Sequence, residues 1–80
     1  MNHPEIRRGV AEILSIILGR SVGVQEIVNR SAETKWDSLK HIELILMTEE
    51  RFNLSFTEEE MGAIDSTEHI CRLIEQKYVS

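Results

Sequence analysis

Residues 36–52 of this 80-residue chain, WDSLKHIELILMTEERF, join a helix-start signal to a long apolar helix. Asp37 is a favoured N-cap, because its carboxylate accepts hydrogen bonds from the unpaired N–H groups of the first turn. Asn53 is expected to end the helix. Ser38 then lies in the first turn with its hydroxyl accessible. Apolar spacing predicts that the buried side of this helix consists of Leu39, Ile42, Ile45, Leu46 and Phe52.

An amphipathic helix is predicted before it, from about residue 4 to residue 18. Pro4 suits its first position, with Asn2 or His3 as the cap, and Gly19 ends it. Its apolar residues recur with the spacing of one helical face: Ile6, Val10, Ile13, Leu14, Ile17 and Leu18.

The connection over residues 19–36 is long for a small domain, and long connections tend to be functional or internally structured. We expect a short helical turn at residues 25–29. Four apolar side chains of this connection are expected to lie under the other helices: Val22, Val24, Ile27 and Val28.

Two further helices are predicted after Phe56, which is expected to enter the core. Thr57 and Glu60 form a capping-box pattern for a short helix that Gly62 ends. Asp65 and Glu68 repeat the pattern and open a last helix. The predicted core face of that last helix is Ile70, Cys71, Ile74 and Tyr78. No segment alternates like a strand, so the chain is predicted to be all-α, a four-helix bundle in one domain over residues 1–80.

Net charge and composition argue against nucleic-acid binding, an internal disulfide and membrane insertion. Fourteen acidic and nine basic residues give a net charge of −5, which disfavours nucleic acid as a partner. The single cysteine, Cys71, cannot form an internal disulfide. We expect a cytoplasmic protein without membrane insertion, because no secretory signal and no long apolar run is visible.

The residues alone do not indicate an enzyme or a metal site. A serine nucleophile needs a histidine base with an orienting carboxylate, and the three histidines, His3, His41 and His69, lie in separate segments. No metal-ligand spacing is present. Taken alone, Asp37 and Ser38 are more typical of a structural helix cap, and Trp36 of a plug at the end of the core.

The chain resembles the acyl carrier protein family in three successive segments: Asp37-Ser38-Leu39, Ile42-Glu43-Leu44-Ile45 and Glu49-Glu50-Arg51-Phe52. The order of the predicted elements extends this resemblance over nearly the whole chain. It implies that Ser38 bears 4′-phosphopantetheine, transferred from coenzyme A by a phosphopantetheinyl transferase, and that Mg²⁺ is needed only by that transferase. Asp37 matches the acidic residue before the family's serine and has a supporting role.

The resemblance further implies a monomeric, non-catalytic carrier of acyl thioesters. Its partners would be a loading ligase and the downstream transferases or synthases of fatty-acid, polyketide or related biosynthesis. It implies a partner-binding surface on the second helix formed by Leu39, Lys40, Glu43, Met47 and Glu50. The cargo would be sheltered among four apolar residues: Leu46, Phe56, Ile64 and Ile74.

Four positions depart from the family's pattern. Lys35 replaces the usual glycine, while Lys40 and His41 make the start of the second helix less negative. Thr67 replaces an aliphatic residue. The less negative start of the second helix weighs against the general fatty-acid carrier. The run Trp36-Asp37-Ser38-Leu39, followed by a basic residue and His41, is similar to stand-alone carriers of specialised pathways. Two alternatives stay open, an aminoacyl or peptidyl carrier loaded by an adenylating ligase and an unmodified helical interaction module.

Overall fold

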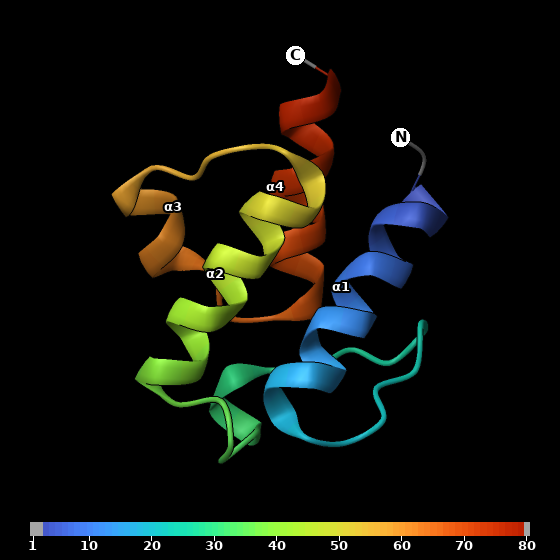
Figure 1. Cartoon of the computed structure of the whole chain (residues 1–80), viewed down its shortest axis with the longest axis vertical. Coiled ribbons are helices and arrows are strands. Elements are labelled where there is room, and N and C mark those ends of the chain that lie inside the picture. Colours follow the sequence, from blue (N-terminus) through green and yellow to red (C-terminus); the bar gives the residue numbers. More distant parts are fainter. Residues whose placement is uncertain (1–2, 80) are drawn as a thin grey trace.

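Helix α1 (His3–Leu18) packs against both α2 (Ser38–Phe52) and α4 (Thr67–Val79) in the computed structural model. The structure describes residues 3–79, and the side chains of residues 4–78. Within that range there are four α-helices and no strand, which confirms the predicted all-α bundle. Figure 1 shows the short helix α3 (Glu58–Ala63) beside α2, and the long connection at the end of the bundle away from the two termini.

The predicted apolar face of α1 is confirmed, because all six of its residues are buried. Gly19 follows the helix with a φ of 68°, a left-handed conformation that favours glycine. Of the two predicted caps, His3 is the first residue of the helix, and Asn2 lies outside the described residues.

The predicted buried side of α2 is partly wrong. Ile45 and Phe52 are buried, but Leu39, Ile42 and Leu46 are 63%, 57% and 60% exposed. Leu44 and Thr48 are buried instead. Apolar residues surround more than half of this helix, so their spacing alone does not select the face that meets α1 and the core.

The connection also departs from the prediction. Val22 and Val28 are buried, whereas Val24 and Ile27 are exposed. The helical turn lies at η1 (Arg30–Ala32) and not at residues 25–29. The reason is that the backbone at Val28 is already hydrogen-bonded across the molecule to the start of α4.

Thr67 forms hydrogen bonds with both the backbone N–H and the backbone carbonyl of Val28. Its hydroxyl accepts from the Val28 N–H at 2.9 Å, and its own N–H donates to the Val28 carbonyl at 2.9 Å. The Arg30 N–H donates to the Asp65 carbonyl at 2.8 Å. Thr67 is itself buried. This polar residue on the inner side of α4 therefore anchors the long connection.

The capping box of α3 is confirmed, with Thr57 Oγ1 accepting from the Glu60 N–H and Glu60 accepting from the Thr57 N–H. Gly62 does not end this helix, which continues to Ala63. The last helix is capped by Ser66, whose hydroxyl accepts from the His69 N–H at 3.2 Å. The predicted cap, Asp65, is wrong, because α4 begins at Thr67 and Ser66 is therefore the residue directly before it.

The core face of α4 is confirmed for Ile70, Cys71 and Ile74, which are buried. Tyr78 is partly exposed, contrary to the prediction, and donates its hydroxyl to the Phe52 carbonyl. Over residues 3–79, the structure contains no helix long and apolar enough to cross a membrane.

A close contact between α1 and α2 supplies a test of the packing. A Cβ added at Gly9 would lie 2.6 Å from Cζ of the buried Phe52, whereas a Cβ at Gly62 would meet nothing within 4 Å. Both substitutions to alanine gain about 1 kcal/mol of helix propensity, and only Gly9→Ala adds a steric clash worth about 1–3 kcal/mol. Urea unfolding should show Gly9→Ala to be less stable than Gly62→Ala by about that difference. Equal stability of the two variants would contradict this packing.

Candidate functional site

Ser38 is the first residue of α2, and its side chain is exposed. Asp37 is the N-cap, as predicted, with extended backbone angles (φ −92°, ψ −173°). Its Oδ1 accepts from the Lys40 N–H at 2.9 Å, and its carbonyl accepts from the His41 N–H at 2.9 Å. The hydroxyl of Ser38 is thus displayed at a capped helix start.

The residue two before Ser38 is a buried anchor. Trp36 is 3% exposed, and its backbone N–H donates to the Glu33 carbonyl at 3.1 Å. Its indole Nε1 donates to His41 Nδ1 at 3.0 Å, and His41 Nε2 lies 2.8 Å from the Met61 carbonyl of α3. Burial of Trp36 confirms its prediction as a plug, whereas the sequence offered no sign of the role of His41.

An ion-pair cluster stabilises the long connection that precedes Trp36. Arg20 Nη2 lies 3.0 Å from Oε2 of both Glu26 and Glu33. The Arg20 guanidinium, and then the Gly23 N–H, hold the pKa of Glu26 below its usual value. Because the carbonyl of Glu33 also accepts from Trp36, this cluster helps to fix the segment that leads into Ser38.

An exposed apolar stripe begins next to Ser38 and follows α2, formed by Leu39, Ile42 and Leu46. The spacing of three and four residues places these side chains on one helical face. Glu43 and Glu50 lie along the edge of the same face, four residues after Leu39 and Leu46, respectively. Lys40 Nζ lies 3.8 Å from Glu43 Oε1. The result is a hydrophobic surface bordered by carboxylates.

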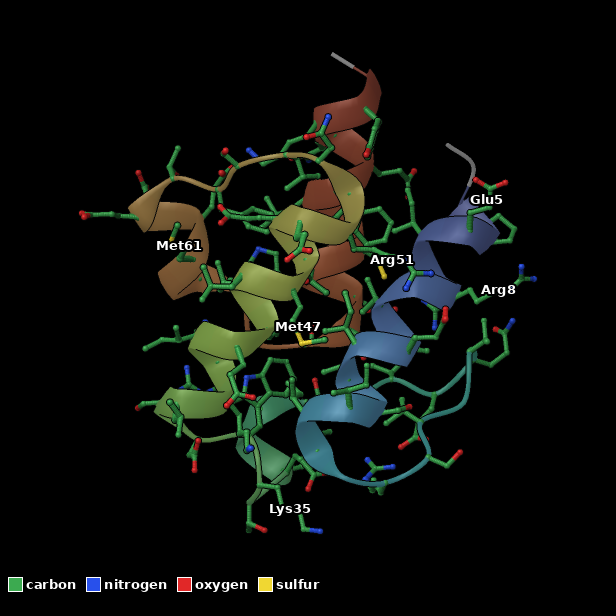
Figure 2. All side chains as sticks on the ribbon, viewed as in Figure 1. Glu5, Arg8, Lys35, Met47, Arg51 and Met61 are labelled. Carbon is green, nitrogen blue, oxygen red and sulfur yellow. The ribbon has the colours of Figure 1, made fainter. Side chains whose placement is uncertain are left out.

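Met47 lies on the side of α2 next to α1. It lines an open hollow of about 240 Å³ between α1 and α2, together with Ile13, Ile16, Glu50 and Arg51. Arg51 Nη2 pairs with Glu12 Oε1 of α1 at 2.9 Å. Figure 2 shows Met47 and Arg51 where α2 borders α1. The predicted partner-binding residues follow Leu39 by one, four, eight and eleven positions and so lie along one side of α2, with Met47 and Glu50 beside the hollow next to α1.

The four predicted cargo residues are also divided. Phe56, Ile64 and Ile74 are buried in the core, whereas Leu46 is exposed. A chain entering the bundle would have to displace the buried three. The fully buried Thr48 has no hydrogen-bond partner for its hydroxyl among the described residues, so the interior already contains one uncompensated polar atom.

The described part of the chain offers neither a metal cluster nor a reactive thiol. Residues 3–79 contain no group of three His, Cys, Asp or Glu residues placed to hold a metal ion. Cys71 is buried, and burial raises the pKa of its thiol to about 11. A thiol with so high a pKa is almost entirely protonated at neutral pH and is a poor nucleophile.

Protein-family models, curated proteins and solved structures were each compared with the chain, and none of them matched.

The N-cap bond of Asp37 can be tested apart from any modification. Replacing Asp37 by alanine removes the acceptor for the Lys40 N–H and should lower the free energy of unfolding by about 0.5–2 kcal/mol. Asp37→Asn retains a side-chain oxygen and should lose much less. Chemical denaturation of both variants measures this, and equal losses would show that the hydrogen bond does not stabilise α2.

Proposed function

We propose that the protein is a carrier that bears 4′-phosphopantetheine on Ser38 and transports acyl groups as thioesters between enzymes. The observation that carries the proposal is the exposed Ser38 hydroxyl at the start of α2, directly after the N-cap Asp37. The resemblance of residues 37–52 to acyl carrier proteins supports the same assignment. The four-helix bundle with a long first connection is the architecture that this resemblance leads us to expect.

The chemistry of the site suits a phosphodiester. Anions are stabilised at a helix N-terminus by unpaired N–H groups and by the helix dipole. Asp37 occupies the Lys40 N–H, which leaves the N–H groups of Ser38 and Leu39 at the tip of the helix. Their direction favours the negative charge that modification would add.

Partner recognition is assigned to the apolar stripe and its acidic edge. Single exposed apolar residues are common, but three on one helical face beside an exposed serine form a continuous surface. Glu43 and Glu50 extend this surface with negative charge, and the whole chain carries −5. A partner enzyme with an apolar patch ringed by lysine or arginine fits this combination.

The interior limits the cargo. A thioester chain that entered between the helices would have to move Phe56, Ile64 or Ile74, which fill the core in the absence of cargo. Short or polar cargo is therefore more compatible with this bundle than a long acyl chain. Aminoacyl or peptidyl cargo, supplied by an adenylating ligase, is the second candidate on the same ground.

We further propose that the carrier acts as a cytoplasmic monomer and has no catalytic activity of its own. A phosphopantetheinyl transferase, which needs Mg²⁺, would modify Ser38. A ligase would load the arm, and transferases or synthases would consume the thioester. His41, three residues after Ser38, uses both of its ring nitrogens for Trp36 and Met61.

Covalent modification tests the proposal directly. Incubation with coenzyme A, Mg²⁺ and a broad-specificity phosphopantetheinyl transferase should raise the intact mass by one phosphopantetheine unit. Ser38→Ala should abolish the gain, while Ser55→Ala, at another exposed serine, should retain it. Failure of the wild-type chain to gain mass would refute both carrier functions and favour an unmodified interaction module. Loading with acyl or amino acid donors then separates the two carrier functions.

The acidic edge of the stripe supplies a separate test. Glu43→Lys should slow association with the transferase, and the effect should be largest at low ionic strength, because exposed charges steer encounter and are screened by salt. Stopped-flow or surface-binding kinetics measure the association rate. Glu68→Lys, which makes the same charge change on α4, is the matched control and should have a smaller effect. If the two variants slowed association equally, net charge rather than this surface would be responsible.

A further inference from the structure

His41 joins two segments that are far apart in the sequence. The centroids of its ring and of the Trp36 indole are 6.1 Å apart, and the two planes meet at 25°. Nδ1 lies 3.0 Å from Trp36 Nε1, and Nε2 lies 2.8 Å from the Met61 carbonyl oxygen. One imidazole thus links the segment before Ser38 to α3.

The two partners determine which nitrogen of His41 carries the proton. An indole N–H is only a donor, so Nδ1 must be the acceptor. A carbonyl oxygen is only an acceptor, so Nε2 must carry the proton and donate. The neutral ring in its Nε2–H form satisfies both bonds at once, and the other neutral tautomer satisfies neither.

Protonation affects the two bonds differently. The imidazolium has no acceptor, so Trp36 Nε1–H loses its partner and faces an N–H group of the same polarity. The bond to the Met61 carbonyl keeps its donor and gains a charge, which strengthens it. Protonation therefore breaks the bond to the buried Trp36 indole and keeps the bond to the Met61 carbonyl.

Among the described residues, no carboxylate of the neighbouring segments contacts the His41 ring to stabilise its imidazolium form. Asp37 accepts from the Lys40 N–H, Glu33 pairs with Arg20, and Glu60 of α3 pairs with Lys77 of α4. The remaining charged groups of these segments are Lys40, which pairs with Glu43, and the exposed Lys35, Glu58 and Glu59. In the described chain, none of these groups has a recorded contact with the His41 ring.

We propose that His41 is a pH-sensitive clamp, which in its neutral form holds the Trp36 segment to α3 and on protonation releases the Trp36 side alone. Histidine side chains change charge between about pH 5 and pH 8. Protonation of His41 on acidification would therefore loosen the segment that precedes Ser38 while α3 stays attached to α2. The proposal does not depend on modification of Ser38.

Trp36 is the chain's single tryptophan, so its fluorescence reports on this clamp directly. On titration from about pH 8 to pH 5, the emission of the unmodified protein should change in one single-proton step. Exchange of the Trp36 indole proton with solvent, followed by NMR, should become about 3–10-fold faster, as expected for loss of one hydrogen bond. Far-UV circular dichroism should stay constant over the range.

His41→Gln is the matched variant, because a neutral amide can accept from the indole and donate to the Met61 carbonyl without titrating. Its fluorescence should not change with pH, whereas His69→Gln, at the partly exposed histidine of α4, should keep the wild-type transition. A transition that persisted in His41→Gln, or its absence from the wild-type protein, would overturn the proposal. Finding the Nδ1–H tautomer for His41 in the ¹⁵N spectrum at pH 8 would also overturn it.

Discussion

The hydrogen bonds between Val28 and Thr67 hold the long connection against the start of α4, and the position of Ser38 depends on them. Two bonds of 2.9 Å join the residues, one of them to a buried hydroxyl. A buried hydroxyl that lost its partner would cost about 1–3 kcal/mol, so these bonds strongly favour a single placement of the connection. From this point the chain passes through η1 and the carbonyl of Glu33 to the buried Trp36. Ser38 then follows after the capping residue Asp37.

One face of helix α2 packs into the core, and the opposite face exposes the apolar stripe. Leu44, Ile45 and Phe52 are buried, and Phe52 lies so close to α1 that only glycine fits at position 9. The apolar stripe on the other face is left in solvent, which a small bundle does not require for its own stability. Exposed apolar side chains contribute favourable hydrophobic free energy only when another surface covers them. Their presence beside Ser38 is the observation on which the proposed protein partner for this face rests.

Local signals in the sequence predicted the parts of the fold that depend on local chemistry. The glycine after α1, the N-cap Asp37 and the capping box of Thr57 and Glu60 are all confirmed, because each depends on residues within one turn. The exposed faces of α2 and the connection were predicted incorrectly, since apolar spacing shows which residues are able to be buried but not which have a neighbour. The anchors at Thr67 and His41 were missed for the same reason. Their partners are 39 and 20 residues away, and no local pattern indicates such a pair.

Polar contacts and the packing of the half-buried Met61 against the core hold α3 in place, so the bond from His41 to this helix matters for its position. No residue of α3 is buried. The helix is attached through the Met61 carbonyl to His41 and through Glu60 to Lys77 Nζ at 2.8 Å, which also lies 5.5 Å from the centroid of the Phe56 ring. Lys77, and then the Thr57 N–H, hold the pKa of Glu60 below its usual value, so this attachment is complete at neutral pH and is lost as the pH falls through that lowered pKa. Elements with few buried apolar contacts open at the lowest free energy, so α3 is the helix whose movement would first uncover Phe56 and Ile64. Because His41 joins α3 to Trp36, such a movement would reach the segment before Ser38 through one imidazole ring.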